Sequence, residues 1–148
     1  MYTLEEFDNE KSKVMKFIVY KRRSEQEVRN KFRNEIDENM LDDIIAYLED
    51  AGYLNDDEYI EKKIQEMMKL KNLSVKELKY KLMSKGLKTN QIEDYIYRNR
   101  EKLVEYELES AKKIIIKKSD LMEKEEIEMF LLKKGYNHDL ILEALEEQ

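Results

Sequence analysis

Two clusters of basic side chains are the residues of this 148-residue chain whose chemistry points most clearly to a partner. The first cluster is Lys21, Arg22 and Arg23, placed between two expected helices. The planar donor fork of arginine suits phosphate and carboxylate groups. The same cations also complement the carbonyl groups at a helix C-terminus. The sequence leaves both roles open for this cluster.

The second basic cluster surrounds an expected helix start at Ser74. Its members are Lys69, Lys71, Lys76, Lys79, Lys81 and Lys85. Lys76 and Lys79 fall outside the apolar stripe of the helix that follows Ser74, so we expect both to face solvent. Lysines in such positions most often form a solvated face, which is the alternative to a binding surface.

The distribution of charge favours a binding surface in the middle of the chain. The formal net charge is −6 overall, and residues 1–54, 55–100 and 101–148 carry −4, +3 and −5. A protein that coats nucleic acid along its whole length is therefore not expected. The candidate contacts to a partner or to DNA are Lys21, Arg22, Arg23, Lys69, Lys71, Lys76, Lys79 and Lys85.

The side-chain groupings of an enzyme or a cofactor site are not found. The chain has no cysteine and one histidine, His138, so a thiolate or multi-histidine metal site is excluded. Its three separate glycines cannot form a phosphate-cradling loop. The acidic runs 56–58 and 123–126 lack the spacing of a calcium loop, and we interpret them as helix-start charges. We expect no catalytic residues, no metal and no cofactor.

The composition favours an all-helical protein. There is no proline, and 41% of the residues are hydrophobic, which is enough to form a core despite 42% charged residues. The chain has no apolar run long enough to span a membrane, and its acidic N-terminus lacks the apolar core of a signal peptide. We therefore expect a cytoplasmic protein that does not bind membranes.

A block of residues that recurs about every fifty positions defines the expected architecture. The first copy contains Val28 and Phe32, which lie 50 residues before Leu78 and Leu82 of the second copy. It lacks the Lys-Gly pair that the second and third copies contain. Such a period predicts three tandem three-helix repeats, at 1–54, 55–100 and 101–148, stacked into an elongated, curved array. Five pairs of positions lie 49 residues apart: Leu78 and Ile127, Leu82 and Leu131, Gly86 and Gly135, Ile92 and Ile141, Ile96 and Leu145.

Local signals indicate where the helices begin and end. Thr3, Ser24 and Ser74 are each followed three residues later by glutamate, the pattern of a capping box. Gly52 suits a left-handed helix end. Because the first repeat has no glycine after its second helix, that helix is expected to continue or to turn differently. Most of the ten tyrosines, such as Tyr59 and Tyr95, lie on apolar stripes and are expected to pack rather than to stack on bases.

The stretch Gly52-Tyr53-Leu54-Asn55-Asp56-Asp57-Glu58-Tyr59 resembles part of the core of RecX proteins. The stretches Tyr20-Lys21-Arg22-Arg23-Ser24, Lys85-Gly86-Leu87 and Lys134-Gly135-Tyr136 continue this resemblance, which extends over roughly residues 13–147. RecX proteins consist of three tandem three-helix repeats. They regulate RecA, the recombinase that coats single-stranded DNA. The resemblance implies binding in the groove of the RecA–DNA filament, with suppression of its ATPase, strand-exchange and coprotease activities.

Three functions from different classes follow from these observations. The first is a RecX-like regulator that acts on the RecA filament in recombination, DNA repair and the SOS response. The second is a helical-repeat module that binds single- or double-stranded DNA independently of RecA. The third is a scaffold for another protein. We expect a monomer that is not an enzyme.

Overall fold

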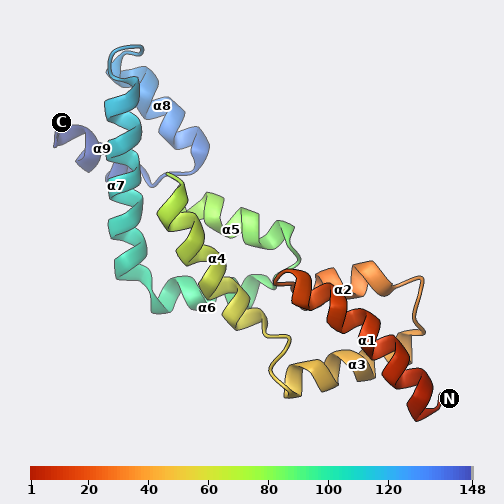
Figure 1. The fold of residues 1–148 in the computed structure, drawn as a ribbon. Coiled ribbons are helices and arrows are strands. Elements are labelled where there is room, and N and C mark those ends of the chain that lie inside the picture. Colours follow the sequence, from red (N-terminus) through yellow and green to blue (C-terminus); the bar gives the residue numbers. More distant parts are fainter. Residues whose placement is uncertain (148) are drawn as a thin grey trace.

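The chain is helical throughout the part that the computed structural model describes, residues 1–147 (Figure 1). No strand occurs within this range, so the expected all-α class is confirmed. The helices are α1 (Leu4–Tyr20), α2 (Glu25–Phe32), α3 (Glu38–Asp50), α4 (Asp56–Leu70), α5 (Val75–Ser84), α6 (Thr89–Arg98), α7 (Arg100–Lys118), α8 (Lys124–Lys134) and α9 (His138–Glu146).

The helices form three groups, each built around its own hydrophobic cluster. We call α1–α3 the first unit, α4–α6 the second unit and α7–α9 the third unit. The units follow one another along an elongated molecule, with the two chain ends at its opposite ends (Figure 1). Helices of eight to 13 residues, such as α2 and α3, are marginal when isolated, so each depends on burying its apolar stripe against the other helices of its unit.

The two joints between units differ in character. Leu103 of α7 belongs to the core of the second unit, and both α5 and α6 pack on α7. The core of the first unit contains only residues of α1–α3 and of the segments that follow α2 and α3. The joint between the second and third units therefore includes apolar contacts. The contacts between the first and second units that are described below are polar.

The capping boxes expected at Ser24 and Ser74 are both present. Each serine hydroxyl accepts from the backbone N–H three residues later, at 3.0 and 3.1 Å. Each glutamate in return accepts the serine N–H, at 3.0 and 2.9 Å. Thr3 makes only the first of these two bonds, to the N–H of Glu6 at 3.0 Å.

The same two serines also join neighbouring units. Ser24 Oγ donates to the carbonyl oxygen of Lys85 at 2.7 Å, and Ser74 Oγ donates to that of Lys134 at 2.7 Å. The two acceptors lie at the C-terminal ends of α5 and α8, where carbonyl groups lack helical partners. Both serines are fully buried. We call this arrangement, which repeats at both joints, the serine clasp.

A glycine follows each clasped carbonyl and lets the helices approach closely. Gly86 and Gly135 have φ angles of +83° and +98°. A Cβ atom on Gly86 would lie 2.5 Å from Gln26 Cβ, and one on Gly135 would lie 2.9 Å from Lys76 Cβ. In the first unit no clasp is made at this point, and α2 ends in a turn whose 3.0 Å bonds run from Glu35 N and Ile36 N to the Phe32 carbonyl. The missing glycine thus corresponds to a different turn, one of the two outcomes expected.

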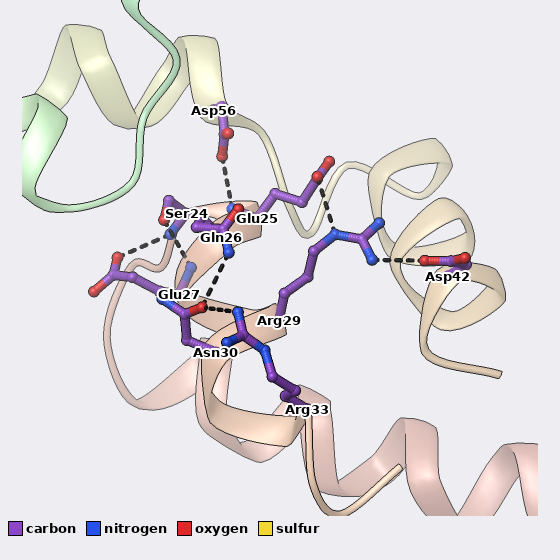
Figure 2. A network of polar contacts seen from close by, with 9 residues as sticks. All are labelled: Ser24, Glu25, Gln26, Glu27, Arg29, Asn30, Arg33, Asp42 and Asp56. Atoms are coloured by element: carbon purple, nitrogen blue, oxygen red, sulfur yellow. Dashed lines mark hydrogen bonds and ion pairs between the residues drawn. The ribbon is translucent and has the colours of Figure 1, made fainter. Parts of the chain in front are cut away.

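An acidic side chain from the next unit completes each joint. The N–H of Glu25 donates to Asp56 Oδ1 at 3.0 Å, and the N–H of Val75 donates to Glu107 Oε1 at 3.1 Å. Figure 2 shows the first of these bonds. Glu107 is only 6% exposed, and burial raises its pKa, although the bond from Val75 acts in the opposite direction.

Replacing Gly86 by alanine should destabilise the protein more than the same change at Gly52. Both glycines have φ near +82°, so each alanine carries a left-handed strain of about 1–2 kcal/mol. Gly52 has no heavy atom within 4 Å of the added Cβ, whereas Gly86→Ala must also push Gln26 away. Overpacking of this kind costs about a further 1–3 kcal/mol. Urea unfolding followed by circular dichroism measures both; equal losses would mean that the close approach does not restrain the joint.

Glu107→Gln should raise the free energy of unfolding at pH 7. The glutamine oxygen can still accept the Val75 N–H, but no buried charge remains. Because burial raises the pKa of Glu107 in the folded state, wild-type stability is fully present below the unfolded pKa and is lost as pH rises through the folded pKa. The advantage of the variant should therefore fade under mildly acidic conditions. Glu105→Gln, at an exposed position of α7, is the control and should change little.

Candidate nucleic-acid and partner interface

The first basic cluster lies at the joint between the first and second units, where most of it is engaged internally. Arg22 Nη1 lies 2.8 Å from Glu58 Oε1. The Arg23 guanidinium lies 3.9 Å from the centre of the Phe17 ring, and its Nε donates to the Phe17 carbonyl at 3.2 Å. Lys21 is exposed. Of the two roles left open by the sequence, Arg23 takes that of complementing a helix C-terminus.

A hollow of about 280 Å³ surrounds Arg22 and Arg23. It is also lined by Gly52, Tyr53 and Glu58, so the stretch 52–59, which resembles part of the RecX core, meets the first basic cluster here. Within this hollow the charge of Arg22 is balanced by Glu58, which leaves a surface of mixed charge rather than a cationic one.

The lysines of the second cluster separate into different environments. Lys76, Lys69 and Lys71 are exposed, and Lys85 is partly buried. Lys79 is also partly buried, and its Nζ lies 2.6 Å from Glu93 Oε1 on α6. The expectation that Lys76 faces solvent is confirmed. Lys79 is less exposed than Lys76 and has an acidic partner, which the packing of α6 beside α5 supplies.

Two lysine-lined grooves flank α5. The α5–α8 groove, about 620 Å³, lies between α5 and the end of α8. The α4–α5 groove, about 270 Å³, lies on the side of α4. The α5–α8 groove is lined by Lys76, Glu77, Tyr80, Lys81, Ser84, Leu132, Lys133, Lys134 and Gly135. The α4–α5 groove is lined by Lys63, Glu66, Met67, Leu70, Lys71, Lys81, Ser84 and Lys85.

The grooves bring together only part of the predicted set. Lys71 and Lys85 share the α4–α5 groove, and Lys76 lies in the α5–α8 groove. Lys69 and Lys79 line neither, although they are close in sequence to residues that do. The sequence-based selection omitted Lys133, Lys134 and the exposed Tyr80. The sequence could have indicated the two lysines, because Lys134-Gly135 repeats Lys85-Gly86 after 49 residues.

Metal-binding and membrane-spanning features are not found in residues 1–147. No three histidine or acidic side chains of this range are arranged to hold a metal ion. His138 is exposed, and its Nε2 lies 3.0 Å from Glu128 Oε1. No helix of the same range combines the length and the apolar character needed to cross a bilayer.

The fold and these grooves define a protein of linked three-helix units with a cationic surface around its central helix. Comparison with solved structures then shows which proteins the chain is similar to. The chain superimposes on the crystal structure of RecX from Lactobacillus salivarius with a TM-score of 0.83 and 27% identity, over 98% of this chain and 97% of that one. A second structure, of a regulatory protein RecX, gives a TM-score of 0.82 at 18% identity, which supports the fold alone.

Sequence comparison leads to the same family. The chain is 28% identical over 137 residues to regulatory protein RecX of Staphylococcus haemolyticus, and 29% identical over 143 residues to that of Clostridium botulinum. These alignments cover 90% of this chain, and 51% and 65% of the two relatives. The chain thus spans about half the length of the staphylococcal relative. No family model matches the chain. The expected resemblance to the RecX family is confirmed in both sequence and fold.

Arg23→Ala should destabilise the protein, whereas Lys21→Ala should not. Arg23 loses its stacking on Phe17 and its bond to the Phe17 carbonyl, together about 1–2 kcal/mol. Lys21 is exposed, and its removal should change stability by less than about 0.5 kcal/mol. Thermal and urea unfolding of the two variants provide the comparison. Equal stability of both would show that Arg23 is free to serve a partner instead.

Proposed function

We propose that this chain regulates a RecA-type recombinase by binding its filament on single-stranded DNA. The observation that carries the proposal is the similarity to a RecX structure over nearly the whole of both chains, at 27% identity. The regulation is inhibitory and acts on the ATPase, strand-exchange and coprotease activities of the filament. The chain needs no chemistry of its own for this role, because occupying a filament surface is sufficient to block the movements or partners that these activities require.

The form of the molecule supports a role in which it lies along a filament. Its three units extend from one end of the molecule to the other instead of closing into a bundle (Figure 1). An elongated protein of this kind has a large surface area relative to its mass. The grooves beside α5 lie in the second unit and at its joint with the third, which places the lysines near the middle of that surface.

The direct test is the single-stranded-DNA-dependent ATP hydrolysis of the cognate RecA, titrated with this protein at fixed salt. Inhibition that increases with dose and is complete at or below equal ratios is expected. No inhibition by a protein shown to be folded by circular dichroism would contradict the proposal. A scaffold for an unrelated partner would then account better for the fold.

Reversing charges in the α5–α8 groove should weaken inhibition. Lys76 and Lys133 are exposed, so Lys76→Glu combined with Lys133→Glu should leave the fold intact. The midpoint of ATPase inhibition should shift to roughly ten-fold higher concentration, because attraction to an anionic nucleoprotein is lost. The matched control combines Lys16→Glu with Lys113→Glu, which changes the net charge equally at exposed sites in α1 and α7. An identical shift in both variants would show that only net charge matters.

A further inference from the structure

The α5–α8 groove has a strongly cationic lining. Four lysines and one glutamate line it, a formal charge of +3. The glutamate, Glu77, is already engaged, because it accepts the Ser74 N–H at 2.9 Å and lies 3.4 Å from Lys134 Nζ. In the described structure no ion pair or hydrogen bond involves the side chains of Lys76 and Lys133. Their charges are therefore available to a ligand.

The first joint shows that these charges are not needed to build the second one. Both joints have the serine clasp, the capping-box glutamate and the close glycine. At the first joint, however, Gln26 stands at the position of Lys76 and Asn30 at that of Tyr80, each 50 residues earlier. Ser84 stands 49 residues before Lys133. The chain thus makes the same joint with uncharged side chains at all three positions.

Gln26 and Asn30 at the first joint also hydrogen-bond with each other, whereas the equivalent Lys76 and Tyr80 at the second do not in the described structure. Gln26 Nε2 donates to Asn30 Oδ1 at 3.0 Å, and Arg33 Nη2 donates to the same oxygen at 2.6 Å (Figure 2). Tyr80, at the position of Asn30, makes no such bond in the described structure, and 73% of it is exposed. The Tyr80 ring is therefore mostly open to solvent.

The placement of Tyr80 suits stacking on an unpaired base. Lys76 and Ser84 lie four residues before and after Tyr80 on α5, so the three side chains share one helix face. Lys133 faces them across the groove. A flat ring flanked by lysines is the arrangement with which proteins hold single strands, since the cations follow the phosphates and the ring stacks on a base. A double helix does not offer unstacked bases to such a ring.

We propose that the α5–α8 groove binds a single strand of nucleic acid, with its phosphates on Lys76, Lys81 and Lys133 and one base stacked on Tyr80. This inference rests on the proposed function, because it names the surface through which the chain meets the strand within a filament. It also makes a claim that can be tested in the absence of a recombinase.

The test is fluorescence anisotropy of a labelled oligothymidylate of about 16 nucleotides, without RecA. Tyr80→Ala should weaken binding about ten-fold, the scale of losing one stacked base, while Tyr80→Phe keeps the ring and should bind like wild type. Tyr97→Ala removes a tyrosine of α6 that is 66% exposed and lies outside the groove, so it is the matched control. Lys76→Ala should reduce the slope of log affinity against log salt by about 0.7.

Several results would overturn the proposal. Equal binding by Tyr80→Ala and Tyr97→Ala would exclude the stack. Polyglutamate and unlabelled oligothymidylate of equal charge can be compared as competitors of the labelled strand. If polyglutamate displaced the strand equally well, the groove would be a site for an acidic protein segment. ATPase inhibition without any binding to the bare strand would overturn this inference and leave the proposed function in place. Strand binding that depends on Tyr80, without ATPase inhibition, would support the groove and contradict the proposed function.

Discussion

The serine clasp is the interaction on which the arrangement of the units depends. One hydroxyl begins a helix by accepting a backbone N–H of its own unit and, in the same position, donates to the last carbonyl of a helix in the next unit. This double role requires full burial of the serine and a backbone that turns away immediately after the carbonyl. The left-handed glycine provides that turn. Capping, burial and chain reversal are therefore one constraint, which is why serine and glycine recur together.

Both joints contain the serine clasp, but the contacts around it differ. Around the second, α7 adds apolar contact through Leu103 and places a buried carboxylate on the free N–H of Val75. Around the first, the contacts between units are polar: Arg22 Nη1 lies 2.8 Å from Glu58 Oε1, and the N–H of Glu25 donates to Asp56 Oδ1 at 3.0 Å. Figure 2 shows the second of these contacts. Exposed ion pairs contribute little to stability. The first unit should therefore separate from the others at lower free energy than the second separates from the third.

Local signals in the sequence predicted the elements well. The capping boxes at Ser24 and Ser74 and the helix end at Gly52 depend only on residues close to one another along the chain, and the structure contains all three. The joints could not be predicted in the same way, because a clasp links residues about 60 positions apart.

The candidate site was predicted less completely for the same reason. Lys79 and Arg22 were selected by charge, but their acidic partners lie on other helices. Tyr59 of α4 is buried and Tyr80 of α5 is 73% exposed, because they lie on helix faces with different surroundings. Neither face nor partner can be read from a count of lysines or tyrosines.

The serine clasp also has a direction, and this bears on self-association. A joint needs a serine on one unit and a carbonyl followed by a left-handed glycine on the next. At the start of α8 the equivalent of Ser74 is Glu123, and no residue in the turn between α2 and α3 has a positive φ angle. The outer faces of the first and third units therefore lack complementary halves. Units that carried both halves would be able to join head to tail from one molecule to another, and such contacts generate open fibres. Within the described residues the serine clasp therefore has two complete copies, and its two halves do not occur at the start of α8 or at the end of α2.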